Sequence, residues 1–134
     1  MLAVTLGAPA IKDKPAPKPT IEGEWQVVSR FDHGAASTDN NRWVFARGGS
    51  AEIREPVENQ VVLRLTFTLA PGGQENALDF YEGQGHGKAD LRQTLYVIKG
   101  DTLTLSFSVG TAPRPTSLDP GTDNFVLVLK RVGR

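Results

Sequence analysis

The sequence predicts an all-β fold, an eight-stranded antiparallel up-and-down barrel. Three observations lead to this prediction: eight short runs alternate apolar with polar residues, most connections between them are short, and no long window has a helical apolar repeat. Eight sequential antiparallel strands with one consistent apolar face can close on themselves and remove both sheet edges. A two-sheet β-sandwich is the alternative, because spacing alone does not show whether the first and last runs pair.

Composition restricts the number of domains and the kinds of partner. The chain has 134 residues, with 15 basic and 15 acidic residues and no cysteine. One domain, over residues 21–134, accounts for this length. Balanced charge removes the positive field on which nucleic-acid binding depends, so nucleic acid is not an expected partner. Without cysteine there are no disulfides, thiolate nucleophiles or cysteine metal sites.

Residues 1–20 differ in composition from the rest of the chain. The run MLAVTLGAPA ends in the small triplet Ala8-Pro9-Ala10, and the proline- and lysine-rich run KDKPAPKPT follows it. We interpret these residues as a clipped signal-peptide remnant and a tether, which predicts an exported protein, periplasmic or secreted. An ordinary disordered N-terminus is the alternative. No segment approaches the ~20 apolar residues of a membrane helix, so we do not expect a membrane-spanning chain.

Four strands are predicted in the first half of the barrel domain. In the first, Trp25, Val27 and Phe31 share one face, and Gln26 and Arg30 lie on the other. The second covers residues 41–46, the third lies around residues 51–53, and the fourth, at residues 61–69, is the longest. Loops are predicted at residues 34–40 and 56–60.

The second half contains four more predicted strands. They cover residues 77–82, 92–99, 102–108 and 125–131. The clearest is the third of these, where Leu103, Leu105 and Phe107 share one face and threonine and serine side chains share the other. Lys99-Gly100-Asp101 is the predicted hairpin turn before it, whereas longer connections are expected at residues 83–92 and 110–124.

Several of these segments are similar to one protein family. The runs GEWQVVS, ALDF, LYVIKGDTLTLSF, RPTSLDP and FVLVLKR resemble the small lipocalin-like domain abundant in planctomycete bacteria, a family without an assigned function. The resemblance covers roughly residues 21–132, and it implies a calycin-type barrel that is usually exported, without implying a ligand. Family members tend to carry a Gly-Thr-Tyr-like segment where this chain has VVLRLTF, so the register of the third and fourth strands stays open.

The resemblance also implies a structural role for Gly23-x-Trp25. In lipocalin-like barrels such a motif opens the first strand, and its indole closes one end of the barrel. A basic residue of the last strand then lies across the indole, and here Lys130 or Arg131 would take that place. A ligand-stacking role for Trp25 is the alternative.

No arrangement typical of an enzyme is present, and we predict a non-catalytic protein without cofactor or metal. His33 and His86 lack partners at the spacings of known metal or hydrolase sites. The run GQGHGK differs from a phosphate loop, which requires Gly at the position of Glu82 and Ser or Thr at that of Ala89.

Binding is the function that remains. An eight-stranded barrel has room either for its own side chains or for one small ligand. We therefore expect an exported binding module for a small apolar molecule, with Trp43, Phe45, Phe67, Tyr96 and Phe107 as the candidate lining. A structural or protein-interaction domain with a filled barrel is the alternative.

The loops predict where a ligand or a protein partner would approach. In a meander barrel with Trp25 at one end, the connections at residues 34–40, 56–60, 83–92 and 110–124 gather at the other end. Because rigid scaffolds usually present function on such loops, we expect any ligand or protein partner to meet this rim.

Overall fold

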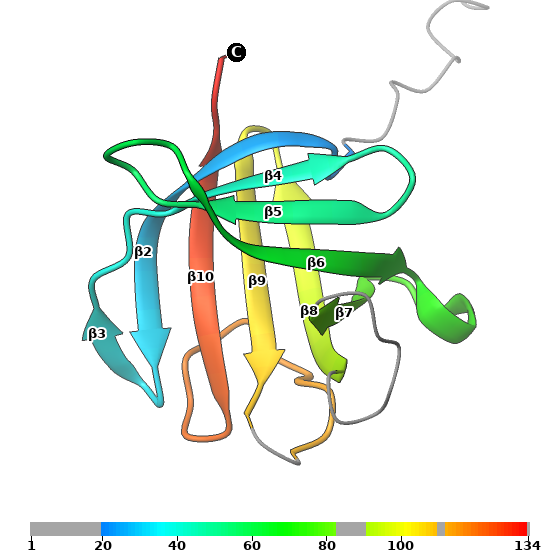
Figure 1. The fold of residues 1–134 in the computed structure, drawn as a ribbon. Helices are drawn as coiled ribbons and strands as arrows, with labels where there is room; N and C mark the ends of the chain where they lie inside the picture. Colours follow the sequence, from blue (N-terminus) through cyan, green and yellow to red (C-terminus); the bar gives the residue numbers. More distant parts are fainter. Residues whose placement is uncertain (1–19, 83–90, 110–111, 134) are drawn as a thin grey trace, which may run out of the picture.

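The computed structural model describes residues 20–82, 91–109 and 112–133, which form a closed antiparallel β-barrel with one extra strand (Figure 1). The barrel strands are β2 (Gly23–Asp32), β4 (Arg42–Ala46), β5 (Ser50–Arg54), β6 (Val61–Leu69), β7 (Ala77–Glu82), β8 (Leu91–Lys99), β9 (Thr102–Ser108) and β10 (Asn124–Arg131). The extra strand is β3 (Ala35–Ser37), and a 3₁₀ turn, η1 (Pro71–Gly73), precedes β7. All eight predicted strands are confirmed.

The barrel closes between its first and last strands. β10 pairs antiparallel with β2, from Phe125 opposite Asp32 to Arg131 opposite Trp25. All other neighbouring barrel strands follow one another in the sequence, with only the extra strand β3 between β2 and β4, and Figure 1 shows β10 between β2 and β9. The predicted up-and-down barrel is therefore confirmed, and the alternative of a two-sheet sandwich is wrong.

Some predictions concern residues that the structure does not describe. Of the expected leader remnant and tether at residues 1–20, only Thr20 is described. His86 and most of the connection at residues 83–92 also lie outside the described residues.

One strand has two different neighbours along the same edge. The first half of β2, Gly23 to Gln26, pairs with β4, whereas its second half, Arg30 to Asp32, pairs with β3. β3 forms within the predicted loop at residues 34–40, and its three residues are exposed. The chain therefore leaves the barrel wall after β2 and returns to it at β4, which brings residues 38–41 to one end of the barrel.

A β-bulge in β2 reverses the faces predicted for the end of this strand. Val27 pairs with Leu129 and Ser29 with Val128, so Val28 is an extra residue without an opposite partner. After the bulge Arg30 lies opposite Leu127, which is part of the buried core. The predicted inward Phe31 and outward Arg30 are therefore wrong, because one inserted residue shifts every later side chain to the other face.

A second bulge fixes the register that the sequence left open. On β5 and β6, Ile53 pairs with Leu63 and Arg54 with Val61, which leaves Val62 unpaired. Leu63 consequently shares its face with the core residue Leu65, although 37% of its surface is exposed.

Trp25 occupies the closed end of the barrel. Its side chain is completely buried, and its Nε1–H donates a hydrogen bond of 2.8 Å to the carbonyl oxygen of Ile21. The guanidinium of Arg131 lies over the indole, 4.1 Å from the ring centroid, whereas Lys130 is exposed and donates to the hydroxyl of Thr102. Of the two basic residues considered for this place, Arg131 is the one that the structure puts there.

Gly23 makes room for that guanidinium. It has a φ of +123°, and a Cβ at this position would lie 3.0 Å from Nη1 of Arg131. A larger residue would therefore be strained and would displace the arginine.

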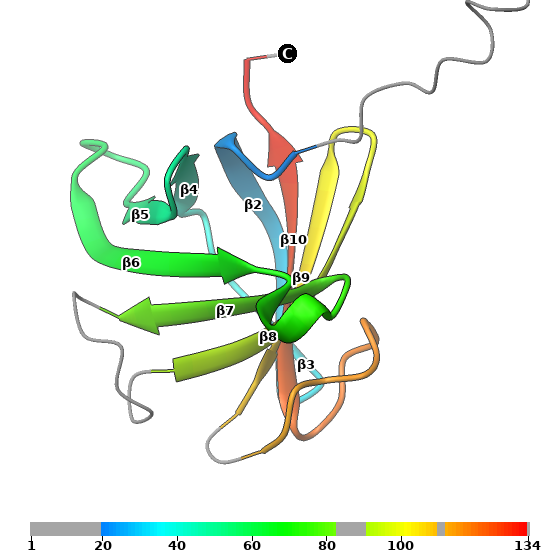
Figure 2. The same cartoon turned by 90° about the vertical axis from the view of Figure 1, so that its right-hand side faces the viewer.

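The connection between β9 and β10 is held against the outside of the barrel (Figure 2). Leu78 and Phe80 belong to the core, so Asp79 between them faces outward, yet Asp79 is buried. Arg114 covers it with an ion pair of 2.7 Å and also donates to the carbonyl oxygens of Leu78 and Thr94. We call residues 112–117 the strap, because this arginine fastens them across β7 and β8.

Candidate functional site

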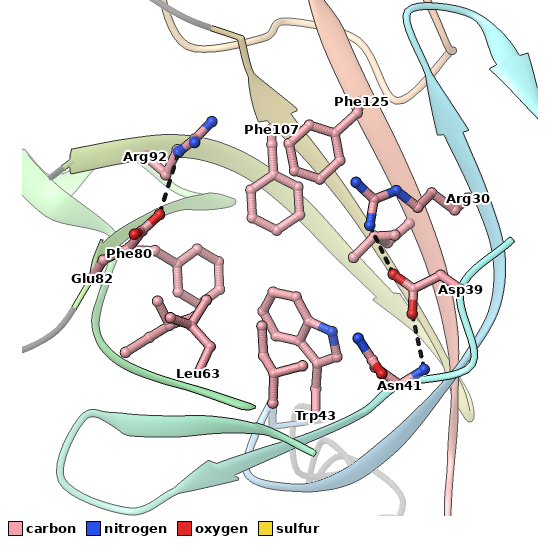
Figure 3. A pocket seen from close by; sticks show the side chains of 13 residues that line it. Arg30, Asp39, Asn41, Trp43, Leu63, Phe80, Glu82, Arg92, Phe107 and Phe125 are labelled. Carbon is pink, nitrogen blue, oxygen red and sulfur yellow. Dashed lines mark hydrogen bonds and ion pairs between the residues drawn. The ribbon is translucent and has the colours of Figure 1, made fainter. Parts of the chain in front are cut away.

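A pocket lies inside the barrel (Figure 3). Its lining residue Phe125 begins the part of β10 that pairs with β2, whereas Trp25 lies opposite Arg131 at the other end of that strand. The volume of the pocket is about 160 Å³. The lining comes from all eight barrel strands and from the segment that precedes β4: Arg30, Asp39, Asn41, Trp43, Ile53, Leu63, Leu65, Phe80, Glu82, Arg92, Phe107, Phe125 and Leu127. Two other hollows, within residues 112–124 and on the β4–β6 wall, are more open or lack aromatic lining.

Aromatic rings from four strands form one wall of the pocket. Trp43 lies 5.6 Å from Phe80 in an edge-to-face arrangement and 5.9 Å from Phe107, measured between ring centroids. Phe107 in turn stacks on Phe125 at 4.5 Å. Since each ring packs against at least one other ring, their positions are fixed before any ligand arrives.

The structure divides the predicted lining residues into two groups. Trp43 and Phe107 line the pocket, whereas Phe45, Phe67 and Tyr96 do not. Phe45 packs edge-to-face on Phe67 at 5.4 Å, and Tyr96 is half-buried against the same core. These three side chains fill the interior outside the pocket, and partial burial raises the pKa of the Tyr96 hydroxyl above its ordinary value.

Arg30 is the main lining residue that the sequence analysis missed. Its guanidinium lies 5.2 Å from the ring centroid of Phe125. Nε donates to both carboxylate oxygens of Asp32, and Nη1 donates to Asp39 at 2.9 Å. Partial burial lowers the pKa of Arg30, but hydrogen bonds to Asp39 and Asp32 outweigh it, so the net pKa is raised and the guanidinium stays charged.

Asp39 belongs to the wall of the pocket. Its side chain is 6% exposed, and Oδ1 accepts the backbone N–H of Asn41 at 2.9 Å. Gln26 ties the same segment to β2, because its side-chain amide donates to the carbonyl oxygen of Asn40. The segment before β4 thus holds a carboxylate in a defined position beside Arg30.

A second ion pair lies across the pocket from the first (Figure 3). Nε of Arg92 is 4.0 Å from the carboxylate of Glu82, and both side chains are about half exposed. Glu82 ends β7 and Arg92 follows the first residue of β8, so this pair sits where the wall reaches solvent. A pair with this separation and exposure is weaker than the Arg30–Asp39 pair.

The predicted rim loops contribute unequally to the pocket. Asp39 comes from the loop predicted at residues 34–40, and Arg92 from the end of that predicted at residues 83–92. No described residue of the connections at 56–60 or 110–124 lines it. In the second of these, the strap is bound to the outer wall instead.

Two general features of the described residues complete the description. Within residues 20–82, 91–109 and 112–133, no three acidic or histidine side chains gather as a potential metal site. In the same part of the chain no helix combines the length and apolarity needed to cross a membrane.

Comparisons with known proteins add no assignment to this geometry. No protein-family model matches the chain, and no curated protein sequence matches it.

Proposed function

We propose that this protein is a non-catalytic, lipocalin-like binding module that holds one small apolar molecule in the pocket at the open end of its barrel. The observation that carries the proposal is an aromatic-walled cavity of about 160 Å³ inside an otherwise filled barrel. A cavity of about 150 Å³ in another protein takes up benzene. The expected ligand therefore carries one ring, or an aliphatic group of similar volume.

Size also sets the expected strength of binding. A ligand with few heavy atoms gains little binding energy in total, so a Kd of about 0.1–1 mM is expected for a bare one-ring compound. A natural ligand with further groups that reach the rim would bind more tightly.

A substitution that fills the pocket tests this proposal. Leu63 lines the pocket and is partly exposed at its mouth, so Leu63→Trp places an indole in the cavity without opening a gap in the buried core. Calorimetric titration of the wild-type protein with benzyl alcohol should give saturable binding with one site, and Leu63→Trp should abolish it.

The adjacent residue gives a matched control. Val62 is 56% exposed and does not line the pocket, so Val62→Trp makes the same kind of change outside the cavity. This variant should bind benzyl alcohol as the wild type does. Equal binding by both variants would show that the compound binds elsewhere.

If the wild type does not bind benzyl alcohol, the alternative function is favoured, that of a structural or protein-interaction domain with a filled barrel. The interior near Phe45, Phe67 and Tyr96 is filled by side chains, as an interaction domain with a solid barrel would require. The exposed tip of the β5–β6 loop, where Val57 is 86% exposed, would then be the first region to examine for a protein partner.

The cellular compartment is a separate proposal. Its support is the Ala8-Pro9-Ala10 triplet, the proline- and lysine-rich run after it, and the resemblance to a family that is usually exported. Expression from the full genomic locus should give a periplasmic or secreted product whose N-terminus has been cleaved. An uncleaved product that stays in the cytoplasm would contradict export.

A further inference from the structure

The charged side chains that line the pocket are two cations and two carboxylates, which balance one another. Arg30 is paired with Asp39, and Arg92 lies across the pocket beside Glu82 (Figure 3). Asp32, which also bonds to Arg30, does not line the pocket. We propose that this balance selects an uncharged one-ring molecule, and that Asp39 and Glu82 are the specificity-determining residues that exclude carboxylates. The proposal rests on the proposed binding function and adds the chemical class of the ligand.

Asp39 contributes most to this selectivity, because two hydrogen bonds hold its carboxylate in place. One oxygen accepts the backbone N–H of Asn41 and the other accepts Nη1 of Arg30, each at 2.9 Å. The side chain is almost completely buried, so it cannot turn away without leaving both donors unpaired. A ligand carboxylate that approached Arg30 would meet this negative charge at a similar distance, and the repulsion would offset the attraction.

Cationic ligands are disfavoured by the same arrangement. An ammonium group that approached Asp39 would come close to the guanidinium of Arg30, which already occupies one carboxylate oxygen. On the opposite side an ammonium group that approached Glu82 would come close to Arg92, which lies 4.0 Å from that carboxylate. Neither sign of charge therefore finds an unopposed partner in the described lining.

Ring size and hydrogen bonding complete the ligand class. The rings of Trp43, Phe80 and Phe107 offer an apolar wall for one aromatic or similarly sized group. A hydroxyl or carbonyl on that group can accept a hydrogen bond from a guanidinium at the mouth, and a hydroxyl can also donate one to a carboxylate, without adding charge.

Three compounds of nearly equal size test the selectivity. Benzyl alcohol, benzoate and benzylammonium share one ring and differ in charge at neutral pH. Calorimetric titration of the wild type at pH 7 and low ionic strength should show benzoate and benzylammonium binding about tenfold or more weakly than benzyl alcohol. A charged ligand loses hydration in the pocket without gaining an unopposed partner, and at low ionic strength salt screens the opposing charges little.

Single substitutions should then move the preference in a predicted direction. Asp39→Asn keeps an oxygen for the N–H of Asn41 but removes the charge, so benzoate should gain about tenfold relative to benzyl alcohol. Glu82→Gln should give a smaller gain for benzoate, about threefold, because the Arg92–Glu82 pair is half exposed. Arg92→Gln should produce the opposite change, a gain of about threefold for benzylammonium.

The outcomes separate this inference from the proposed function. If benzyl alcohol fails to bind the wild type, the binding function and the inference both fail. If benzyl alcohol binds but benzoate binds equally well, the function stands and the selectivity is wrong. The Glu82 and Arg92 variants change exposed side chains, so they decide the question even if Asp39→Asn does not fold. If both variants kept the ligand preference of the wild type, the inference would be overturned.

Discussion

Trp25 is the residue on which the interactions of the closed end converge. Its indole is completely buried, bonded to the carbonyl of Ile21 and covered by Arg131. The same arginine donates to the carbonyl oxygens of Glu22 and Thr20, so it joins the start of the barrel domain to the last strand. These contacts link residues near both ends of the described chain.

Substitutions at this end should therefore differ widely in cost. Trp25→Ala should lower the free energy of unfolding by about 3–5 kcal/mol, because a large buried side chain leaves a cavity. Arg131→Ala should cost about 1–2 kcal/mol through the lost cation–π contact and hydrogen bonds. Lys130→Ala, the neighbouring exposed control, should stay within about 0.5 kcal/mol. Urea titrations measure all three, and equal losses for Arg131 and Lys130 would contradict the role given to the arginine.

Glu55 organises the loop between β5 and β6. Its carboxylate accepts the backbone N–H groups of Gln60, Glu58 and Val57. These hydrogen bonds, that of Gln60 first, hold the pKa of Glu55 below its ordinary value. The loop contacts are thus complete at neutral pH and should be lost as the pH falls through this lowered pKa.

Amide NMR spectra recorded during acid titration can test this pH dependence. The amide signals of Val57, Glu58 and Gln60 should move together with one midpoint below the ordinary pKa of glutamate. Glu55→Gln should remove that shared transition, whereas Glu58→Gln should leave it, because Glu58 accepts only the side-chain amide of Gln60 among described contacts. A midpoint above the ordinary value would contradict the assigned hydrogen bonds.

The strap depends on one ion pair between a loop and two strands. Arg114 and Asp79 are 13% and 10% exposed, and the arginine also donates to two strand carbonyls. Beneath the same connection, Asn124 donates to the hydroxyl of Ser106, whose side chain faces the outer wall and is buried. The outer surface around Asp79 and Ser106 is therefore covered, which the polar alternation of these strands did not predict.

Removal of Arg114 should lower the free energy of unfolding by more than the removal of an arginine from a half-exposed ion pair. Arg114→Ala leaves the Asp79 carboxylate without its cation in a nearly buried site. We therefore expect the free energy of unfolding to fall by about 3 kcal/mol. Arg92→Ala breaks the half-exposed pair with Glu82, at the mouth of the barrel, and should cost about 0.5 kcal/mol or less. Chemical denaturation of both variants compares them directly. Similar small losses would mean that the strap is not fastened by this pair.

Strand positions could be predicted from the sequence because period-two alternation is a local property. It fails at β2, where Val28 is inserted without any glycine or proline to mark the bulge. The sequence analysis therefore placed Arg30 outside and missed the charged side of the pocket. Trp43 and Phe107 were correctly predicted in the lining. Their strands contain no bulge, so the faces of these two side chains follow the simple alternation.

The remaining errors concern depth and long-range contacts. Alternation predicts which face a side chain takes, but not how far along the barrel axis it lies, so Phe45, Phe67 and Tyr96 were included in the lining. The contact of Arg114 with Asp79 joins residues far apart in the sequence, and nothing local to either residue indicates it. The sequence analysis assigned this connection to the rim from the meander order of the strands, which does not show whether a loop folds back along the outer wall.

At the scale of the whole molecule, the pairing of β2 with β10 closes the barrel. β2 and β10 come from opposite ends of the domain, and their pairing removes the edges that an open sheet would expose. One part of the interior is filled around Trp25, Phe45 and Phe67, whereas the other holds the pocket.

Hydrogen exchange can test whether the closing seam is as stable as the rest of the wall. Peptides from β2 and β10 should be protected as strongly as those from β8 and β9, since the seam is paired along most of β10. The amides of β3 and of residues 57–59 should exchange much earlier, because both segments are exposed outside the barrel wall. Faster exchange in β2 and β10 than in β8 and β9 would mean that the seam opens in solution, and a pocket that depends on Arg30 from β2 and Phe125 from β10 would then open with it.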